Sequence, residues 1–234
     1  EYCVEDEAEA IKWYRKAAER GYLDAQLSLG RIYDDGEGVA KDEAEAIKWY
    51  RKAAEQGNAM AQVEIGNHYL DGTGVDEDEV EAAKWYRKAA EQGNANGQVS
   101  LGGCYLCGTG VEKDEAEAVK WFRKAAEQGD ASAQTFLADC YLFGRGVAKD
   151  ETEALTWFRR AAKQDVYRAK TAKNYLKAVE DDDPEAQCHL AKAYQVGLCC
   201  AENEVEAVKW YRKAAEQGHK DAETALQELQ KSQS

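Results

Sequence analysis

The ten residues KWYRKAAEQG at positions 48–57 recur, almost unchanged, along the whole chain. Close copies occupy 12–21, 84–93, 120–129 and 209–218, and a more divergent copy, TWFRRAAKQD, occupies 156–165. Their tryptophans are 36 residues apart, except for a longer interval after the divergent copy. A fixed period of this length is typical of a repeat protein, in which each unit packs mainly on its neighbours.

One unit, residues 24–57, divides into two predicted helices. We call the second helix B-type, and it contains the quoted stretch. Asp42 is a favourable N-cap, and Glu45 three residues later completes the pattern of a capping box. Gly57 follows the helix where a left-handed residue is needed. The second helix of each unit should therefore begin after an aspartate and end before a glycine.

The first helix of the unit, called A-type, is predicted from Ala25 to about Asp35. Glutamine, leucine, a small residue and tyrosine recur in it at fixed slots, which hold Gln26, Leu29, Gly30 and Tyr33 in the first copy. A glycine or alanine weakens a helix interior, so its recurrence predicts that a neighbouring helix comes close at that slot. Between the two helices lies G-x-G-V, in which two glycines turn the chain and a valine fills the seam.

These motifs together resemble those of the Sel1-like repeat family, a relative of the tetratricopeptide repeat. The resemblance implies an all-α, right-handed superhelical solenoid of antiparallel helix pairs. It also implies that the A-type helices line a concave surface and that the protein acts as an adaptor or scaffold. We expect about five pairs, with a lone B-type helix in front, one extra helix inside and a capping helix behind.

The whole chain, residues 1–234, is expected to form a single solenoid domain with one irregular insertion. The interval from Trp157 to Trp210 exceeds the repeat period and places the insertion at about 165–181. It is predicted to be an extra B-type helix, or the continuation of one long helix from Thr152. The last loop, GLCC at 197–200, departs from G-x-G-V, and the capping helix is expected at about 220–232.

Charge and hydropathy limit the possible partners. Asp and Glu number 45 against 31 Lys and Arg, which gives a net charge of −14. So acidic a chain repels phosphate backbones, which argues against nucleic acid or an anionic membrane surface. No apolar run approaches the roughly 20 residues of a membrane helix. The expected partner is a protein or peptide, and the chain itself is expected to be a monomer.

The seven cysteines are odd in number and irregular in spacing, which is not the pattern of a disulfide framework. We interpret most of them as buried, free thiols, which favours a cytoplasmic location and leaves a secreted or periplasmic one open. The cysteine-rich branch of the family pairs cysteines eight residues apart, but Glu180 stands at the slot before Cys188. That branch's disulfides are therefore not expected here.

No pattern in the chain indicates catalysis, a metal or a cofactor. The C-x-x-C at 104–107 lacks the two further ligands of a zinc site and lies at a helix C-terminus, where a thiolate is not stabilised. His68 shares its slot with apolar residues of other repeats and is predicted to be a packed residue. We therefore predict a protein that is not an enzyme.

Positions that differ between repeats are free to carry specificity. In the A-type helices they form three columns at i, i+3 and i+7, which is one stripe on one face. The candidate partner-binding residues on it are Arg31, Asp35, Glu64, Asn67, Asp71, Phe136, Asp139, Phe143, His189 and Lys192. The acidic first half should attract basic side chains, and the aromatic second half should grip apolar ones.

Two alternatives accompany this prediction. Phe136 and Phe143 could instead pack against the extra helix and serve only the fold. The chain as a whole could also be a structural or regulatory spacer module of a larger multidomain protein, since Glu1 begins partway through a repeat.

Overall fold

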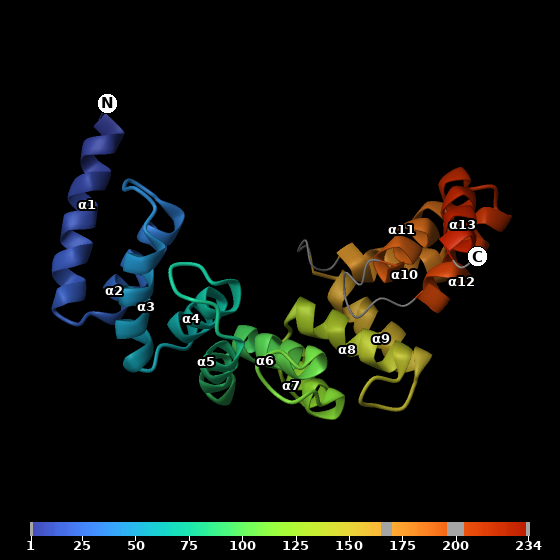
Figure 1. Ribbon diagram of the computed structural model, residues 1–234, viewed down its shortest axis with the longest axis horizontal. Helices are drawn as coiled ribbons and strands as arrows, with labels where there is room; N and C mark the ends of the chain where they lie inside the picture. Colours follow the sequence, from blue (N-terminus) through green and yellow to red (C-terminus); the bar gives the residue numbers. More distant parts are fainter. Residues whose placement is uncertain (1, 165–169, 196–203, 233–234) are drawn as a thin grey trace. The chain divides into compact units, whose positions relative to one another are not determined.

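The computed structural model describes residues 2–164, 170–195 and 204–232, which form thirteen α-helices and no strand. The all-α prediction is confirmed (Figure 1). The helices are α1 (Tyr2–Glu19), α2 (Leu23–Asp35), α3 (Glu43–Glu55), α4 (Ala59–Asp71), α5 (Glu79–Glu91), α6 (Ala95–Cys107), α7 (Glu115–Glu127), α8 (Ala131–Phe143), α9 (Glu151–Ala162), α10 (Lys170–Glu180), α11 (Pro184–Gln195), α12 (Glu204–Glu216) and α13 (Lys220–Ser232).

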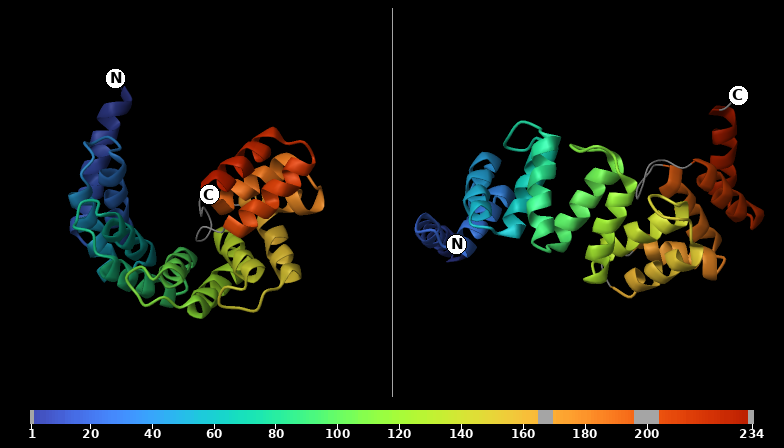
Figure 2. Two further views of the ribbon diagram at one scale, coloured as in Figure 1. Left: turned by 45° about the vertical axis from the view of Figure 1, so that its right-hand side comes forward. Right: turned by 90° about the horizontal axis from the view of Figure 1, so that it is seen from below.

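Residue contacts group the chain into two compact units, Glu1–Trp121 and Phe122–Ser234. The division falls within α7, so unit 1 contains α1–α6 and the first half of α7, and unit 2 contains the rest. A-type helices alternate with B-type helices along most of both units, and neighbouring helices lie side by side (Figure 2).

The predicted aspartate N-caps are present in α3, α5 and α9, but the capping box is only half formed. In α1 the prediction is wrong, because the helix begins at Tyr2 and Asp6 lies inside it. The Asp42 carboxylate accepts a hydrogen bond from the Glu45 backbone N–H at 2.9 Å. The Asp42 N–H does not pair with the Glu45 side chain, and instead donates to the Tyr33 carbonyl at 2.8 Å. Glu45 accepts from the indole N–H of Trp49. The cap residue therefore closes the A-to-B loop as well as starting the helix.

The second glycine of the G-x-G-V loop packs directly on the preceding repeat. Gly74 has a φ of 71°, and a Cβ there would lie 2.6 Å from the backbone carbonyl carbon of Glu43. Only glycine satisfies both the left-handed conformation and this approach. The loop valines, such as Val39 and Val111, pack against buried clusters, as predicted.

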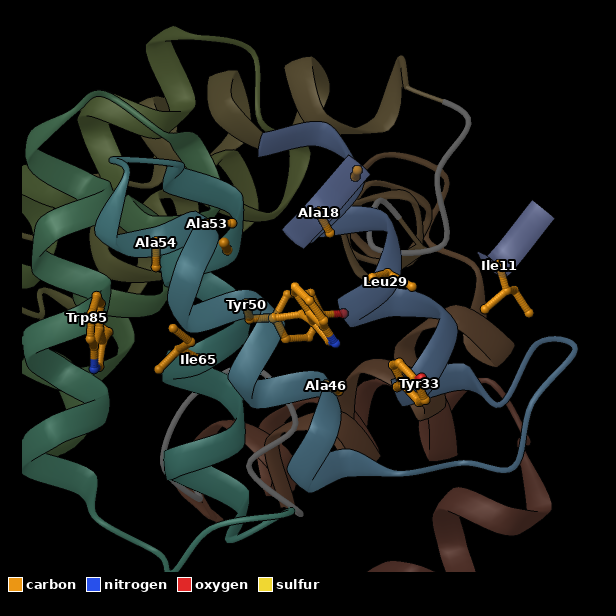
Figure 3. Close-up of a cluster of buried hydrophobic side chains, with 13 residues drawn as sticks. Ile11, Ala18, Leu29, Tyr33, Ala46, Tyr50, Ala53, Ala54, Ile65 and Trp85 are labelled. Carbon is orange, nitrogen blue, oxygen red and sulfur yellow. The ribbon is translucent and has the colours of Figure 1, made fainter. Parts of the chain in front are cut away.

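The small residues of α2 and α4 lie against an aromatic ring of the B-type partner helix. A Cβ at Gly30 would overlap the ring of Tyr50, and Gly66 stands in the same relation to Tyr86. Both tyrosines are 2% exposed. Figure 3 shows Tyr50 between Leu29 and Ile65 in a cluster that continues from α1 to α5. The predicted close approach of helices is confirmed, and the core is continuous across repeats.

A buried glutamine of each A-type helix joins three helices. Gln62 is 4% exposed, and its side-chain amide donates to the Ala54 carbonyl at the end of α3 at 3.2 Å. Its own oxygen accepts from the amide of Gln92, just beyond α5, at 2.7 Å. The same two bonds are made by Gln26, Gln134 and Gln187. The glutamine in KWYRKAAEQG is thus one half of this contact.

The arginine of the quoted stretch links α1, α3, α5 and α7 to the A-type helix that follows, whereas its counterpart in α9, Arg159, bonds to Glu180 of α10. Arg51 donates to the Tyr69 hydroxyl at 2.9 Å, and Arg87 donates to the Tyr105 hydroxyl at 2.6 Å. Arg123 bonds to Tyr141 in the same way within unit 2. The repeated polar residues therefore serve the scaffold.

The insertion contains a separate helix. α9 ends at Ala162, and α10 is a distinct helix, so the prediction of one long helix from Thr152 is wrong. Tyr175 of α10 is 4% exposed and stacks on Phe158 with ring centroids 4.4 Å apart. The GLCC loop lies outside the described residues. Among the described helices, none has the length and hydrophobicity needed to cross a bilayer.

Replacing Gln62 with alanine should remove two hydrogen bonds, so that the Ala54 carbonyl accepts only from backbone N–H groups and the Gln92 amide donates only to the Lys88 carbonyl. We expect the free energy of unfolding to fall by about 1–3 kcal/mol, measured by urea titration with circular dichroism. The control is Gln92→Ala, which keeps the buried Gln62–Ala54 bond and should cost less than about 1 kcal/mol. Equal losses in the two variants would contradict the role given to the buried amide.

Candidate binding surface

Unit 1 carries five of the predicted residues on one stripe of α2 and α4, here called the acidic stripe: Arg31, Asp35, Glu64, Asn67 and Asp71. Arg31, Asp35 and Asp71 are exposed, whereas Glu64 and Asn67 are half-buried. The equivalent positions of α6 hold Ser100, Gly103 and Cys107, so the charge of the stripe is confined to the first two A-type helices.

A tyrosine from the B-type helix holds the middle of the acidic stripe. The Tyr86 ring passes Gly66, and its hydroxyl donates to the Asn67 side-chain oxygen at 2.9 Å. The Asn67 amide in turn donates to the Glu64 carboxylate at 3.0 Å. The missing side chain at Gly66 therefore lets a ring from beneath fix the orientation of two surface residues.

Several charges of the first repeats surround the Tyr50 ring. Burial raises the pKa of Tyr50, and the carboxylates of Glu64 and Asp34 raise this pKa further, against the opposing effect of Arg31. Because like-signed carboxylates lie near one hydroxyl, the region has a negative potential that favours cations.

His68 lies beneath the stripe and is 4% exposed, which confirms the prediction of a packed residue. Its Nδ1 lies 2.9 Å from both the carbonyl and the hydroxyl oxygen of Thr73, and its Nε2 lies 3.6 Å from the Asp34 carboxylate. The ring therefore joins α4 to α2 rather than facing solvent.

The aromatic candidates of unit 2 are half-buried and held by other rings. Phe136 stacks on Phe122 with centroids 5.1 Å apart, and Phe143 meets Tyr194 edge to face at 5.2 Å. These partners come from α7 and α11, not from the extra helix that the alternative prediction named. Both phenylalanines contribute to the packing of the fold.

The remaining candidates of unit 2 differ in exposure. His189 and Lys192 are exposed on α11, and His189 Nε2 lies 3.8 Å from a Glu185 carboxylate oxygen. Asp139 is 4% exposed, so the prediction that its side chain faces a partner is corrected. It belongs to the interior of the unit.

Asp139 was predicted to face a partner, and nothing in the sequence indicated that it is a buried acid. One of its carboxylate oxygens has no hydrogen-bond partner among the described residues. Burial raises the pKa of Asp139 to about 8, and the charge of Arg145 only partly opposes this. The carboxyl is therefore largely protonated near neutral pH. Its column also holds exposed Arg31 and half-buried Asn67, so the slot gave no sign of burial.

Four cysteines, Cys104, Cys107, Cys140 and Cys188, form no disulfide and lie in different environments. Cys104 and Cys140 are buried, as predicted, but Cys107 is exposed and so is not a core residue. Burial raises the pKa of the Cys104 thiol to about 11, which disfavours the reactive thiolate. No group of three or more potential metal ligands occurs in the described part of the chain.

The Sel1 repeat model matches residues 2–22, 23–58, 59–94, 95–130, 131–166 and 184–219. The chain belongs to the Sel1 repeat family. The first match covers only a B-type helix, so the six matches correspond to one partial repeat and five helix pairs. The unmatched segment, 167–183, contains α10, in the region where the insertion was predicted.

Solved structures of other Sel1 repeat proteins resemble this chain. A Sel1 repeat protein from Oxalobacter formigenes is 37% identical, with a TM-score of 0.64 over 88% of this chain and 75% of the other. A putative Sel1 repeat protein from Klebsiella pneumoniae subsp. pneumoniae, at 20% identity and a TM-score of 0.57, covers 94% of this chain and 99% of its own; it shares the fold. The search among curated proteins found no match.

Replacing Asp139 with asparagine should change how stability depends on pH. Between about pH 4 and 8 the unfolded chain loses the Asp139 proton and the folded chain retains it, so the wild type loses stability as pH rises through this window. The asparagine variant has no such proton to lose. Its free energy of unfolding should therefore rise relative to that of the wild type by up to about 1.4 kcal/mol per pH unit.

Melting temperatures of both proteins from pH 5 to pH 9 measure the effect, and the gap between them should widen up to about pH 8 and then stay constant. Asp130→Asn is the control, because it makes the same change at the N-cap of the same helix, where other repeats carry asparagine. A constant gap between wild type and Asp139→Asn would contradict the assignment of a buried neutral acid.

Proposed function

We propose that this chain is a non-catalytic, protein-binding scaffold, and that the acidic stripe of unit 1 recognises a basic segment of its partner. Sel1 repeat proteins generally act as scaffolds for protein interactions. The observation that carries the proposal is the difference between repeated and variable polar residues. The repeated ones bond within the fold, whereas three variable ones on α2 and α4, Arg31, Asp35 and Asp71, are exposed.

The outward groups are available to a ligand. Arg31, Asp35 and Asp71 are exposed, and the described residues offer them no hydrogen bond or ion pair. Asp35 and Asp71 end successive A-type helices, so a bound segment would meet two carboxylates in the same position of adjacent repeats. Lysine and arginine are the side chains that such carboxylates bind, and arginine does so with two parallel hydrogen bonds.

The scaffold keeps this surface in place. Tyr86, Asn67 and Glu64 form a fixed chain of hydrogen bonds, so those side chains lose little further entropy when a ligand binds. Charge complementarity should act mainly on specificity and on the association rate, and the affinity should fall as salt rises.

Reversing the charge at the two exposed aspartates, Asp35 and Asp71, tests the proposal. The Asp35→Lys, Asp71→Lys variant should bind a fluorescent Lys/Arg-rich peptide about tenfold more weakly or worse at low salt, since each exposed ion pair contributes up to about 1 kcal/mol. Fluorescence anisotropy measures the dissociation constant, and circular dichroism verifies that the variant is folded.

The matched control is Glu55→Lys, Glu91→Lys, which makes the same change in net charge at exposed positions on B-type helices. It should bind the peptide nearly as well as the wild type. An equal loss in the control would show that net charge alone attracts the peptide, and the acidic stripe would then not be the recognition surface.

A further inference from the structure

One chain of hydrogen bonds in unit 1 connects a buried ring of α5 to a carboxylate at the surface of α4. The Tyr86 hydroxyl donates to the Asn67 side-chain oxygen at 2.9 Å, and the Asn67 amide donates to Glu64 Oε2 at 3.0 Å. Tyr86 is 2% exposed, whereas Glu64 is half-buried. Burial raises the pKa of Tyr86, so its hydroxyl keeps its proton and remains a donor. The scaffold therefore holds one carboxylate of the acidic stripe from beneath.

Of the five helix pairs, only α4–α5 has the residues for this chain of bonds. In α2 and α11 the slot of Asn67 holds Arg31 and Lys192, which are donors and cannot accept from a tyrosine. In α7 and α9, the B-type partners of α6 and α8, the tyrosine is replaced by Phe122 and Phe158, which have no hydroxyl. The repeated tyrosine therefore has this second role in one repeat alone.

The Glu64 carboxylate retains acceptor capacity for a ligand. A carboxylate offers about four acceptor sites on its two oxygens. The described residues fill one of them, through the bond from Asn67 to Oε2. Among these residues no cationic side chain forms an ion pair with Glu64, although exposed Arg31 lies on the same stripe. The second oxygen of an already oriented group is therefore open to an incoming donor.

An ordered carboxylate and a free one differ in how they select between basic side chains. The guanidinium of arginine is a planar fork that pairs with a carboxylate through two parallel bonds, whereas the ammonium of lysine is a compact point charge. Asp35 and Asp71 are exposed and have no partner among the described residues, so they suit either cation. Glu64 is held by Asn67 and loses less conformational entropy when it forms the two-bond geometry.

We propose that Glu64 is the specificity-determining residue of the acidic stripe, and that it binds an arginine of the partner through two parallel hydrogen bonds. Tyr86 and Asn67 are its positioning residues. The segment that the stripe recognises then contains an arginine at this position, while Asp35 and Asp71 bind neighbouring cations of either kind. The inference rests on the proposed function, because it assigns the ligand of the same surface.

The test compares three fluorescent peptides of equal length and charge at low salt. Their basic residues are all arginine, all lysine or all dimethylated arginine, which keeps the charge but blocks two-bond pairing. Fluorescence anisotropy measures the three dissociation constants for the 234-residue chain. The wild type should bind the arginine peptide about fivefold more tightly than either of the others, the factor expected for one additional hydrogen bond.

Variants of the chain identify the residues responsible. Tyr86→Phe removes the hydroxyl without a change in net charge, and the slot already holds phenylalanine in α7 and α9. The arginine peptide should lose more affinity than the lysine peptide, which reduces the preference to about twofold or less. Glu64→Gln should also abolish the preference, and the lost charge should weaken the binding of all three peptides.

The matched control is Tyr211→Phe in unit 2. It removes an equivalent hydroxyl, which donates to the Gln195 side-chain oxygen at 2.8 Å and belongs to another A/B pair. This variant should retain the full preference for arginine. Circular dichroism spectra like that of the wild type verify that each variant is folded.

The outcomes separate this inference from the proposed function. Equal binding of the arginine and lysine peptides by the wild type would overturn the assignment of Glu64 and leave the recognition of basic segments standing. The same holds if Tyr86→Phe weakens both peptides by one factor, since a merely structural role predicts that result. If the wild type binds none of the peptides, the proposed function is overturned, and the inference that rests on it is overturned as well.

Discussion

The buried glutamine of each A-type helix is the contact on which the repeat array depends. The last carbonyls of a helix have no partner within that helix, and a carbonyl buried without one costs free energy. The Ala54 carbonyl accepts from the Gly57 N–H and also from the Gln62 amide of the next repeat, and the oxygen of that amide accepts from the following glutamine of the same pair. Each amide is therefore satisfied only when three helices are in register. This explains why both glutamines recur with the period of the repeat.

A second constraint follows from the glycine slot. Because Gly66 has no side chain, the Tyr86 ring lies against the A-type helix and its hydroxyl reaches Asn67 on the other side. The packing of the pair and the orientation of surface residues thus have one cause. The scaffold residues are repeated because every interface has the same geometry, and the exposed residues of the stripe, Arg31, Asp35 and Asp71, vary because they take no part in it.

Local features of the fold could be predicted from the sequence because they depend on residues close in the chain. The aspartate caps, the glycine turns, the extra helix and the helix near 220–232 belong to this class. The glutamine contact joins residues 30 positions apart and needs the stacked helices to be seen. The reciprocal half of the capping box was wrong because the Tyr33 carbonyl takes the Asp42 N–H, a competition that the motif does not show.

The exposure of the candidate residues could be predicted from the sequence only where neighbouring helices leave the position uncovered. Arg31 and Asp139 occupy equivalent positions, yet one is exposed and the other is buried. In unit 2 the Asp139 carboxylate lies near enough to Tyr175 of α10 to raise the pKa of that tyrosine, so the inserted helix belongs to the surroundings of α8. Column position therefore identifies the face of a helix, but the exposed fraction of each side chain depends on packing that sequence columns do not record.

The central claim is that recognition resides on the stripe of α2 and α4. The most direct measurement is an NMR titration of the isotope-labelled chain with an unlabelled Lys/Arg-rich peptide. The account predicts that the largest amide shifts fall on the last two turns of α2 and α4 and on Tyr50 and Tyr86 beneath them. Shifts confined to the outer faces of α3 and α5, or spread evenly over all acidic residues, would contradict it.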